Sequence, residues 1–491
     1  MPNRVVTYRP AGPAGAPGVP AVADPLAARF AAVRSELHVP EAFPAEVLGA
    51  AEAAALTRPD GIPDRTEVPL WTLDPVGSMD LDQAMHLSRE EAGFRVRYAI
   101  ADVPFFVSAG GPLDLEARRR GQTIYLPDTR VPLHPPALSE AAASLLPGQD
   151  RPAYLWEIDL DAHGETRSVT VERALVRSRA RRDYVAVQAS VDAGAADEQV
   201  GLLREIGLLR MALEAARGGA SLPMPEQEVV ATDGGYRLGY RPPLAAEDWN
   251  AQISLLTGMA AAGIMLEGGV GILRTMPAPP RESVRRFRRQ ARALGVPWPD
   301  GQRYGEFLRS LDRTDPRQLA LVHEATSLFR GAGYTPFDGA APAQREHAAV
   351  AAPYAHVTAP LRRLVDRFGL VVCAALCAGS EVPSWARAAL PELPALMAEG
   401  DHRASAVERA CTDAVEAAVL GSVVGAVYPA TVVDRTSAHA PIVQITDPAV
   451  LSAAHGPGAP GDEVRVQVRG TDIAAGRVDL LVLGGDPAAQ T

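Results

Sequence analysis

The chain of 491 residues contains no lysine, since all 48 of its basic residues are arginine. This absence excludes enzymes that form a Schiff base through lysine, including those that use pyridoxal phosphate. It also excludes the phosphate-loop NTPases and the protein kinases, whose motifs require a lysine. Arginine binds phosphate and carboxylate groups in a bidentate manner. Long cationic side chains that contact an anion in this protein must therefore be arginines.

Cysteine and long apolar runs are also scarce. The three cysteines, Cys373, Cys377 and Cys411, lie in apolar helical patterns and form neither a metal-type pair nor a disulfide framework. The longest apolar run, 368–378, is far shorter than the roughly 20 residues that span a membrane. The N-terminal residues lack a signal-peptide pattern. From these absences we expect a cytoplasmic protein without a membrane segment.

The composition, with 47% hydrophobic and 22% charged residues, is typical of a globular protein. The length suggests about three domains on a prior of roughly 150 residues each. A net charge of −11 does not exclude a nucleic-acid partner, because a deep channel can be positive while the outer surface is acidic.

Composition and periodicity divide the chain into four parts. Residues 1–24 are rich in Ala, Pro and Gly without periodicity and predict a flexible tail. Residues 25–66 contain two helical patterns, which form either a small helical domain of the helix-turn-helix kind or a plain helical cap on the next domain. Residues 67–421 mix short strands with helices and predict an α+β domain. Short strands joined by turns in 422–487 predict a β-barrel of the OB type.

The densest chemical signal is the segment 73–83, LDPVGSMDLDQ. Asp80 and Asp82 project from one face if this segment is extended, and a turn at Pro75 and Gly77 can bring Asp74 back toward them. Three such carboxylates would repel one another and raise their pKa values. A divalent cation, Mg²⁺ or Mn²⁺, is the simplest way to keep all three ionised. On spacing alone a solvated acidic turn is the alternative, and the ligand spacing of an EF-hand is absent.

Further blocks follow this segment in a fixed order. They are 98–103 (YAIADV), 121–128 (GQTIYLPD), 354–366 (YAHVTAPLRRLVD) and 403–409 (RASAVER). Together with 74–84 they resemble the catalytic domain of the RNase II/RNase R (RNB) family of exoribonucleases. The resemblance implies an α+β fold, with a mixed sheet surrounded by helices, followed by a C-terminal OB-fold barrel that binds RNA. It also implies processive 3′-to-5′ hydrolysis of single-stranded RNA with a free 3′ end, releasing nucleoside 5′-monophosphates.

The family resemblance assigns roles to the acidic segment. It implies that Asp74, Asp80 and Asp82 bind Mg²⁺, or Mn²⁺, and that Asp82 acts at the scissile phosphate. Two ions about 3.5–4 Å apart would hold the attacking and leaving oxygens. The family motif ends in a second adjacent aspartate where this chain has Gln83. The glutamine carbonyl oxygen can still coordinate a metal, but with one negative charge fewer.

The resemblance also names catalytic and RNA-binding residues outside that segment. Arg362 matches the family arginine at the scissile phosphate, Glu408 matches a glutamate that supports activity, and Tyr125 matches an aromatic that stacks on a terminal base. Arg363 is expected to contact RNA beside Arg362. Without the resemblance, Tyr125 would be interpreted as a core aromatic and the two arginines as a solvated helix start. Two arginine-rich runs, 173–182 and 281–292, either line a phosphate channel or form solvated surfaces.

Two departures from the family leave alternatives open. Family members usually carry two cold-shock barrels before the catalytic domain, whereas only residues 1–66 precede it here. The helix expected at 249–266 has Ala251, Gln252 and Gly258 where the family has an acidic pair and an asparagine. The alternatives to an active exoribonuclease are a non-catalytic RNA-binding member with a weakened metal site, and a phosphodiesterase that acts on small nucleotides. We expect a monomer without an obligate protein partner.

Overall fold

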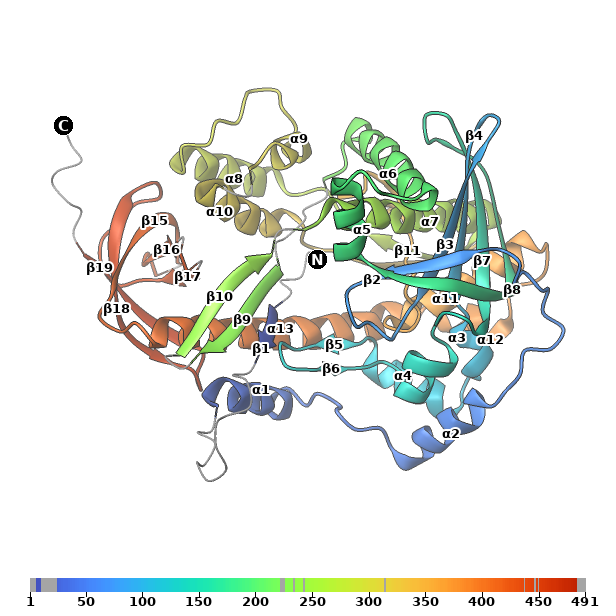
Figure 1. The fold of residues 1–491 in the computed structure, drawn as a ribbon. Helices are drawn as coiled ribbons and strands as arrows, with labels where there is room; N and C mark the ends of the chain where they lie inside the picture. The colour runs from blue at the N-terminus through green and yellow to red at the C-terminus, as the bar shows by residue number, and fades with distance from the viewer. Residues whose placement is uncertain are drawn as a thin grey trace.

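The computed structural model describes residues 6–9, 24–220, 226–232, 235–241, 243–312, 315–436, 438–445, 447–448 and 450–483. A closed barrel lies at the end of the molecule opposite the C-terminal sheet, visible in Figure 1 as the long strands. The barrel strands are β2 (Leu70–Asp74), β3 (Gln83–Glu90), β4 (Gly93–Ala101), β7 (Asp150–Asp161) and β8 (Thr166–Asp183). The β2–β8 pair is parallel and the other pairs are antiparallel, so the predicted mixed sheet is confirmed.

Alternation of side chains along the strands fills the main core. In β4, Val96, Tyr98 and Ile100 are fully buried and belong to one cluster with Trp156 of β7. Residues two apart in a strand point to the same face, so each strand supplies a row of side chains to this core. Helices α6 (Glu198–Arg217), α7 (Ala245–Gly268) and α11 (Leu364–Cys377) contribute their apolar faces to the same cluster.

Helix α7 explains the departures at Gln252 and Gly258. The Gln252 amide donates to Glu214 of α6 at 2.6 Å in the buried α6–α7 interface. A Cβ at Gly258 would lie 2.1 Å from the Tyr354 ring and 2.7 Å from the Ala355 carbonyl oxygen. Ala355 N also donates to the Gly258 carbonyl at 3.0 Å. Any side chain with a Cβ at position 258 would therefore collide with the segment that leads to Arg362.

The same helix is relevant to the expected absence of a membrane segment. Among the described residues, α7 alone is long and apolar enough, by length and composition, to cross a membrane. It packs against α6 and α11, and its buried side chains include Ile253, Leu256 and Met265. A long apolar helix in a protein core passes the same test, so this finding is weak evidence for a membrane span.

The expected helices and strands of the catalytic region are largely present, and additional ones surround the barrel. The helices are α3 (Val103–Phe106), α4 (Pro112–Arg120), α5 (Tyr184–Asp192), α8 (Arg281–Ala293), α9 (Tyr304–Arg309), α10 (Pro316–Ala325), α12 (Ser384–Ala389) and α13 (Leu393–Gly421), with a π-helix at Leu138–Ala142 and a 3-10 helix at Thr326–Leu328. The paired strands are β5 (Ile124–Tyr125) with β6 (Arg130–Val131), β11 (Val270–Thr275) with β12 (Gly333–Asp338), and β13 (Glu346–His347) with β14 (Ala352–Pro353).

The two N-terminal helices do not form a helix-turn-helix unit. The apolar side chains of α1 (Pro25–Glu36) pack against α13, in the cluster that contains Cys411. Those of α2 (Ala45–Ala55) pack against α4 and the π-helix. Figure 1 shows the two helices well apart along the lower edge of the molecule. This packing favours the alternative of a helical cap over a separate helical domain at 25–66, because each helix buries its apolar face on a different part of the catalytic region.

The predicted flexible tail lies mostly outside the described residues. Four of its residues, Val6–Arg9, instead form strand β1, which pairs in parallel with β9 (Glu226–Thr232). β9 pairs with β10 (Gly235–Arg241), and Tyr8 packs on Phe30 of α1. This part of the tail prediction is wrong, because a short strand can complete a sheet whose other strands are remote in sequence.

The C-terminal sheet has the strand order β17-β16-β15-β18-β19. Its members are β15 (Val427–Arg435), β16 (Pro441–Ile445), β17 (Val450–Ala453), β18 (Glu463–Asp472) and β19 (Arg477–Leu483). A bridge between His455 and Leu481 brings the two edges of the sheet together. Buried valines, including Val432, Val443 and Val466, form its own core. The predicted OB-type C-terminal fold is confirmed, in the form of a half-open barrel.

Candidate active site

The acidic segment connects β2 to β3 across one end of the barrel. Gly77 has φ +83°, in the region where a side chain is strained, and Ser78 N donates to the Pro75 carbonyl. Ser144 fixes the next residues, because its hydroxyl accepts from Leu81 N at 2.9 Å and donates to the Met79 carbonyl at 2.6 Å. The predicted turn is therefore present and places all three aspartates near the end of the barrel.

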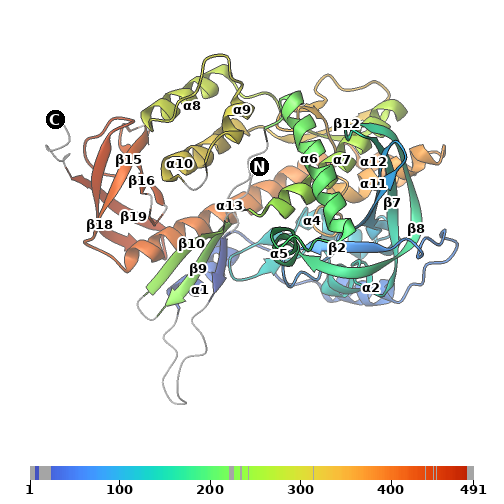
Figure 2. The same cartoon turned by 45° about the horizontal axis from the view of Figure 1, so that its top comes forward.

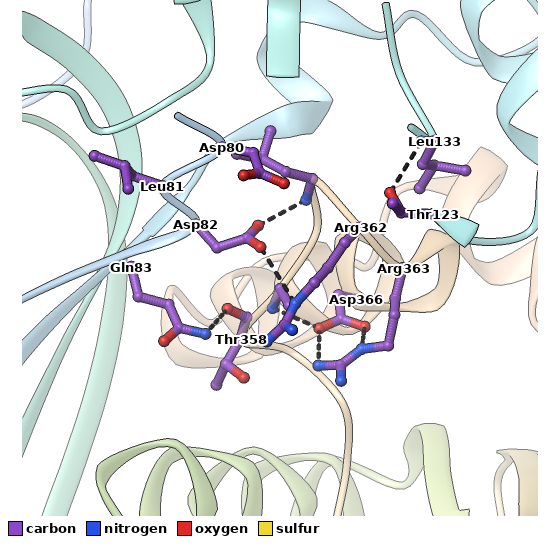
Figure 3. A network of polar contacts seen from close by, with 12 residues as sticks. Asp80, Leu81, Asp82, Gln83, Thr123, Leu133, Thr358, Arg362, Arg363 and Asp366 are labelled. Atoms are coloured by element: carbon purple, nitrogen blue, oxygen red, sulfur yellow. Dashed lines mark hydrogen bonds and ion pairs between the residues drawn. The ribbon is translucent and has the colours of Figure 1, made fainter. Parts of the chain in front are cut away.

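Asp82 is held by residues from the 354–366 block. Its Oδ1 accepts from Leu361 N at 2.7 Å, and Arg362 Nε lies 3.6 Å from Oδ2 (Figure 3). Burial raises the pKa of Asp82 to about 8; the Arg362 charge and the Leu361 N–H oppose this rise, while Asp366 and Asp80 add to it. The structure thus joins two motifs that lie nearly 280 residues apart in sequence.

Asp74 ends strand β2 and faces the same region. Burial raises its pKa to about 7, the Arg362 and Arg181 charges oppose the rise, and Asp80 adds to it. Its Oδ2 is buried and has no hydrogen-bond partner among the residues that the structure describes. A buried carboxylate oxygen without a partner is costly, so this oxygen is suited to accept a cation or a proton.

Asp80 is turned toward a different partner. Arg130 Nη1 lies 2.5 Å from its Oδ1, and Arg130 Nη2 lies 2.9 Å from Glu140 Oε1. Arg130 belongs to the β5–β6 hairpin, where it pairs directly with Tyr125. This contact could not be predicted from residue types, because it depends on the hairpin register and on the fold of the acidic segment.

Gln83 has both ends of its side-chain amide engaged. Its Nε2 donates to the Thr358 carbonyl at 2.6 Å, and its Oε1 accepts from Tyr98 at 2.6 Å. Tyr98 in turn contacts Ser254 of α7 at 2.9 Å. Gln83 therefore links β3 to the segment before Arg362, and its role as a metal ligand stays a prediction.

The two neighbouring arginines differ in their environment. The Arg362 side chain is 46% exposed, and its backbone carbonyl accepts from Thr123 N at 2.9 Å. Arg363 forms a bidentate pair with Asp366, with distances of 2.9 and 2.8 Å (Figure 3). Asp366 also accepts from Ala359 N at 2.7 Å. The geometry presents Arg362 to a substrate and gives Arg363 a positioning contact, so RNA contact by Arg363 stays a prediction.

Tyr125 presents its ring to solvent. The residue is 54% exposed, which argues against the alternative of a core aromatic. Its hydroxyl lies close enough to Asp80, Asp82 and Arg362 for their charges to act on it. An exposed aromatic beside the carboxylates is suited to stack on a base.

Glu408 lies on α13, next to the buried Val407. Helix α13 passes the Tyr125 segment, since Gly400 approaches the Gly121 backbone and Ala404 packs in the cluster of Ile124. The structure thus places Glu408 on an element that borders the site, and its supporting role stays a prediction.

By donor chemistry, the acidic residues fit a divalent cation. Asp74 and Asp82 offer hard oxygen ligands, and their raised pKa values reflect burial that a cation would compensate. Within the described ranges, however, no group of three or more His, Cys, Asp or Glu side chains is placed to hold a metal ion. Asp80 would have to leave Arg130 to join the other two.

These pKa values predict how pH affects the cation-free protein. In the unfolded chain, Asp74 and Asp82 would each have a pKa of about 3.9. In the folded protein the pKa of Asp74 is raised to about 7 and that of Asp82 to about 8, so both carboxyls keep their protons to higher pH. Proton binding by these carboxyls adds to the free energy of unfolding. This contribution is fully present below the pKa of the unfolded chain and is lost as pH rises through the pKa values of the folded protein. In EDTA, the melting temperature should therefore fall between about pH 4 and pH 8.

Mg²⁺ should counter that loss, because it binds the ionised carboxylates. We expect the Mg²⁺-induced rise in melting temperature to be larger at about pH 8 than at about pH 6. Asp82→Asn should reduce both the fall in melting temperature with pH in EDTA and the rise that Mg²⁺ induces. Scanning calorimetry with and without Mg²⁺ measures this, and a Mg²⁺ effect independent of pH would contradict the assignment.

Comparisons with known proteins agree with this arrangement. A family model described as RNB domain matches residues 63–372, and one described as RNase II-type exonuclease C-terminal S1 domain matches residues 426–483. Ribonuclease R of Escherichia coli is 29% identical over 346 residues, which are 67% of this chain and 42% of that protein. The chain spans less than half the length of the first curated relatives it matches.

Two solved structures share the fold. Mycoplasma genitalium RNase R in complex with ribose-methylated single-stranded RNA superposes with a TM-score of 0.82 and 18% identity, covering 94% of this chain and 78% of that one. Yeast Ssd1, described as a pseudonuclease, superposes with a TM-score of 0.66 and 17% identity, covering 83% of this chain and 52% of that one. The same fold thus occurs in a protein named as a nuclease and in one named as a pseudonuclease.

Proposed function

This chain belongs to the RNB domain family, whose model matches more than half of it, and on that premise we propose that it is a processive 3′-to-5′ exoribonuclease. Its substrate would be single-stranded RNA with a free 3′ end, and its products nucleoside 5′-monophosphates. This proposal rests mainly on the contacts of Asp82 with Leu361 N and the Arg362 side chain. They place a buried carboxylate beside an exposed guanidinium.

Each of the residues at this site would have a separate role in phosphodiester hydrolysis. The exposed guanidinium of Arg362 is placed to neutralise charge that develops on the scissile phosphate. The Leu361 N–H fixes the orientation of Asp82, and the Arg363–Asp366 pair fixes the segment that carries both. The Tyr125 ring would stack on a base near the 3′ end, which requires no particular sequence.

Asp74 and Asp82 would hold a divalent cation, and Asp80 would join them after release from Arg130. When bound, Mg²⁺ or Mn²⁺ would polarise the phosphate and lower the pKa of the attacking water. The raised pKa values of Asp74 and Asp82 imply that their carboxyls give up protons when the cation binds.

A second candidate function, RNA binding without turnover, has its own support. The Gln83 amide is engaged by Thr358 and Tyr98, and Arg130 already neutralises Asp80. Because Gln83 is neutral and Asp80 is paired with a cation, the site offers metal ions less negative charge than four free carboxylates would. A shared fold with the yeast pseudonuclease is consistent with this alternative.

Product analysis tests the proposed function. RNA labelled at its 5′ end is incubated with the protein and Mg²⁺, and products are resolved by length and by nucleotide chromatography. The proposal predicts 5′-monophosphates, together with a short 5′-labelled end product that replaces the full-length RNA without abundant intermediates. Internal fragments of mixed length, or products formed equally in EDTA, would contradict it.

Tyr125→Ala tests the stacking role. We expect the dissociation constant for the 3′ end of single-stranded RNA to rise about 5- to 150-fold, since stacking on one base contributes roughly 1–3 kcal/mol. Tyr125→Phe keeps the ring and should bind within about twofold of the wild type. Fluorescence anisotropy with a 5′-labelled oligomer, in EDTA so that the RNA stays intact, measures both variants, and equal losses in both would exclude stacking as the cause.

A further inference from the structure

The side chains of the two arginine-rich runs, 173–182 and 281–292, make different contacts in the structure. In the run 173–182, Arg173 pairs with Asp102 at 2.7 Å, Arg177 with Asp150 at 2.5 Å and Arg182 with Asp197 at 2.7 Å. This run therefore neutralises carboxylates of the barrel and its surroundings. Its other two arginines, Arg179 and Arg181, donate to the Thr66 and Ser78 carbonyls, so contact of this run with phosphate stays a prediction.

The run on α8 is arranged differently. Arg281, Arg285, Arg289 and Arg292 are exposed, and none of them has an ion pair or side-chain hydrogen bond within the described part of the chain. At 100° per residue, these four positions fall within one 80° sector of the helix. The spacing of 1.5 Å per residue makes this stripe about 16 Å long. We call these four side chains the α8 stripe.

The opposite side of α8 anchors it firmly. Phe287 and Ala291 are fully buried in a cluster with α9 and α10, and Phe287 contacts Trp298 and Phe307 edge to face. The remaining two arginines are used in packing, since Arg286 pairs with Asp434 and Arg288 lies over the Trp298 ring. A helix packed on its opposite face thus carries four arginines that take no part in that packing.

The position of α8 connects the stripe with the C-terminal domain. Asp434 lies on β15, a Cβ added at Gly461 would lie 3.2 Å from Ala293, and Val433 belongs to the same buried cluster as Phe287. Figures 1 and 2 both show α8 beside the C-terminal sheet and away from the barrel strands. The stripe therefore borders the domain that matches the S1 model, outside the candidate active site.

We propose that the α8 stripe is a second, sequence-independent contact surface for the RNA backbone, which holds the strand outside the active site. Four unpaired guanidiniums in a row are complementary to a row of phosphates. On a chain with net charge −11 such a local concentration of positive charge would select a polyanion. This inference rests on the proposed RNA substrate, but it requires binding and not turnover.

The test compares RNA length, using the full chain with Asp82→Asn so that the RNA is not degraded. Arg281, Arg285, Arg289 and Arg292 are all replaced by glutamine, which preserves helix propensity. A control variant replaces three exposed arginines that lie elsewhere on the surface, Arg58, Arg167 and Arg204, by glutamine. Circular dichroism shows whether each variant is folded. Binding is measured with single-stranded RNA of about six and about thirty nucleotides over a range of salt concentrations.

The stripe variant should bind the long RNA about 10- to 100-fold more weakly at low salt, with less than a twofold change for the short RNA. Its slope of log affinity against log salt should fall by about two to three, since each neutralised phosphate contributes roughly 0.7. The control variant should retain the wild-type slope. Equal slopes for all three proteins on long RNA would overturn the proposal. If wild-type protein binds RNA without degrading it, the proposed hydrolysis fails while the stripe can still be tested.

Discussion

Asp82→Asn is expected to lower the rate of nucleotide release by about 10³-fold or more while RNA binding persists. Asparagine has the same shape and can still accept the Leu361 N–H, which lies 2.7 Å from Oδ1. It removes only the negative charge that would hold a cation next to Arg362. The measurement is single-turnover release of nucleotide from labelled RNA in saturating Mg²⁺.

The raised pKa of Asp82 gives this variant an internal control. With a pKa of about 8, the wild-type carboxyl is largely protonated at neutral pH when no cation is present, so it resembles asparagine. The melting temperatures of wild type and variant should then agree in EDTA at about pH 7, and differ when Mg²⁺ is added. Asp150→Asn, at a surface pair with Arg177, is a matched substitution that should leave turnover unchanged. A fully active Asp82→Asn variant would refute the assigned role.

Arg362→Gln is expected to lower turnover by about 10²- to 10³-fold, the effect of removing one preorganised donor from a developing oxyanion. Arg362 also opposes the rise in the pKa of Asp82. Its loss should therefore raise the Mg²⁺ concentration needed for half-maximal activity, in addition to lowering kcat. Arg362→Lys retains the charge without the planar fork, and should lose less activity than the glutamine variant.

The coupling between the two residues can be measured separately. Arg362 Nε lies 3.6 Å from Asp82 Oδ2, so the double variant should lose much less than the product of the single losses. Arg387→Gln, at an exposed pair with Asp338, is the matched control. Strictly multiplicative losses would show that Asp82 and Arg362 act independently, contrary to the site described above.

The sequence predicted the parts of the site that depend on local spacing. Asp74, Asp80 and Asp82 were identified because a turn at Gly77 follows from local residue types, and the family resemblance supplied Arg362. The partner of Asp80 could not be predicted in this way. Arg130 reaches it through the β5–β6 register, and Leu361 contributes a backbone N–H that no residue type reveals.

In the fold, too, local patterns were predictable from sequence and tertiary contacts were not. Periodicity predicted both N-terminal helices correctly, but not their surroundings. Leu26 and Phe30 are buried against α13, whereas Val47 is buried against α4 and the π-helix. Strand β1 was missed because its partner, β9, lies more than two hundred residues later. Amphipathic pattern indicates that a face is buried, but tertiary packing decides what covers it.

The central claim is that this site hydrolyses RNA and does not merely bind it. The most direct measurement follows 5′-labelled single-stranded RNA at protein concentrations that bind all of it, in EDTA and over a series of Mg²⁺ and Mn²⁺ concentrations. We expect nucleoside 5′-monophosphates to appear only with a divalent cation, and Asp82→Asn to fail to release them. RNA that stays bound and intact at every concentration of both cations would contradict the claim and favour a non-catalytic RNA-binding protein.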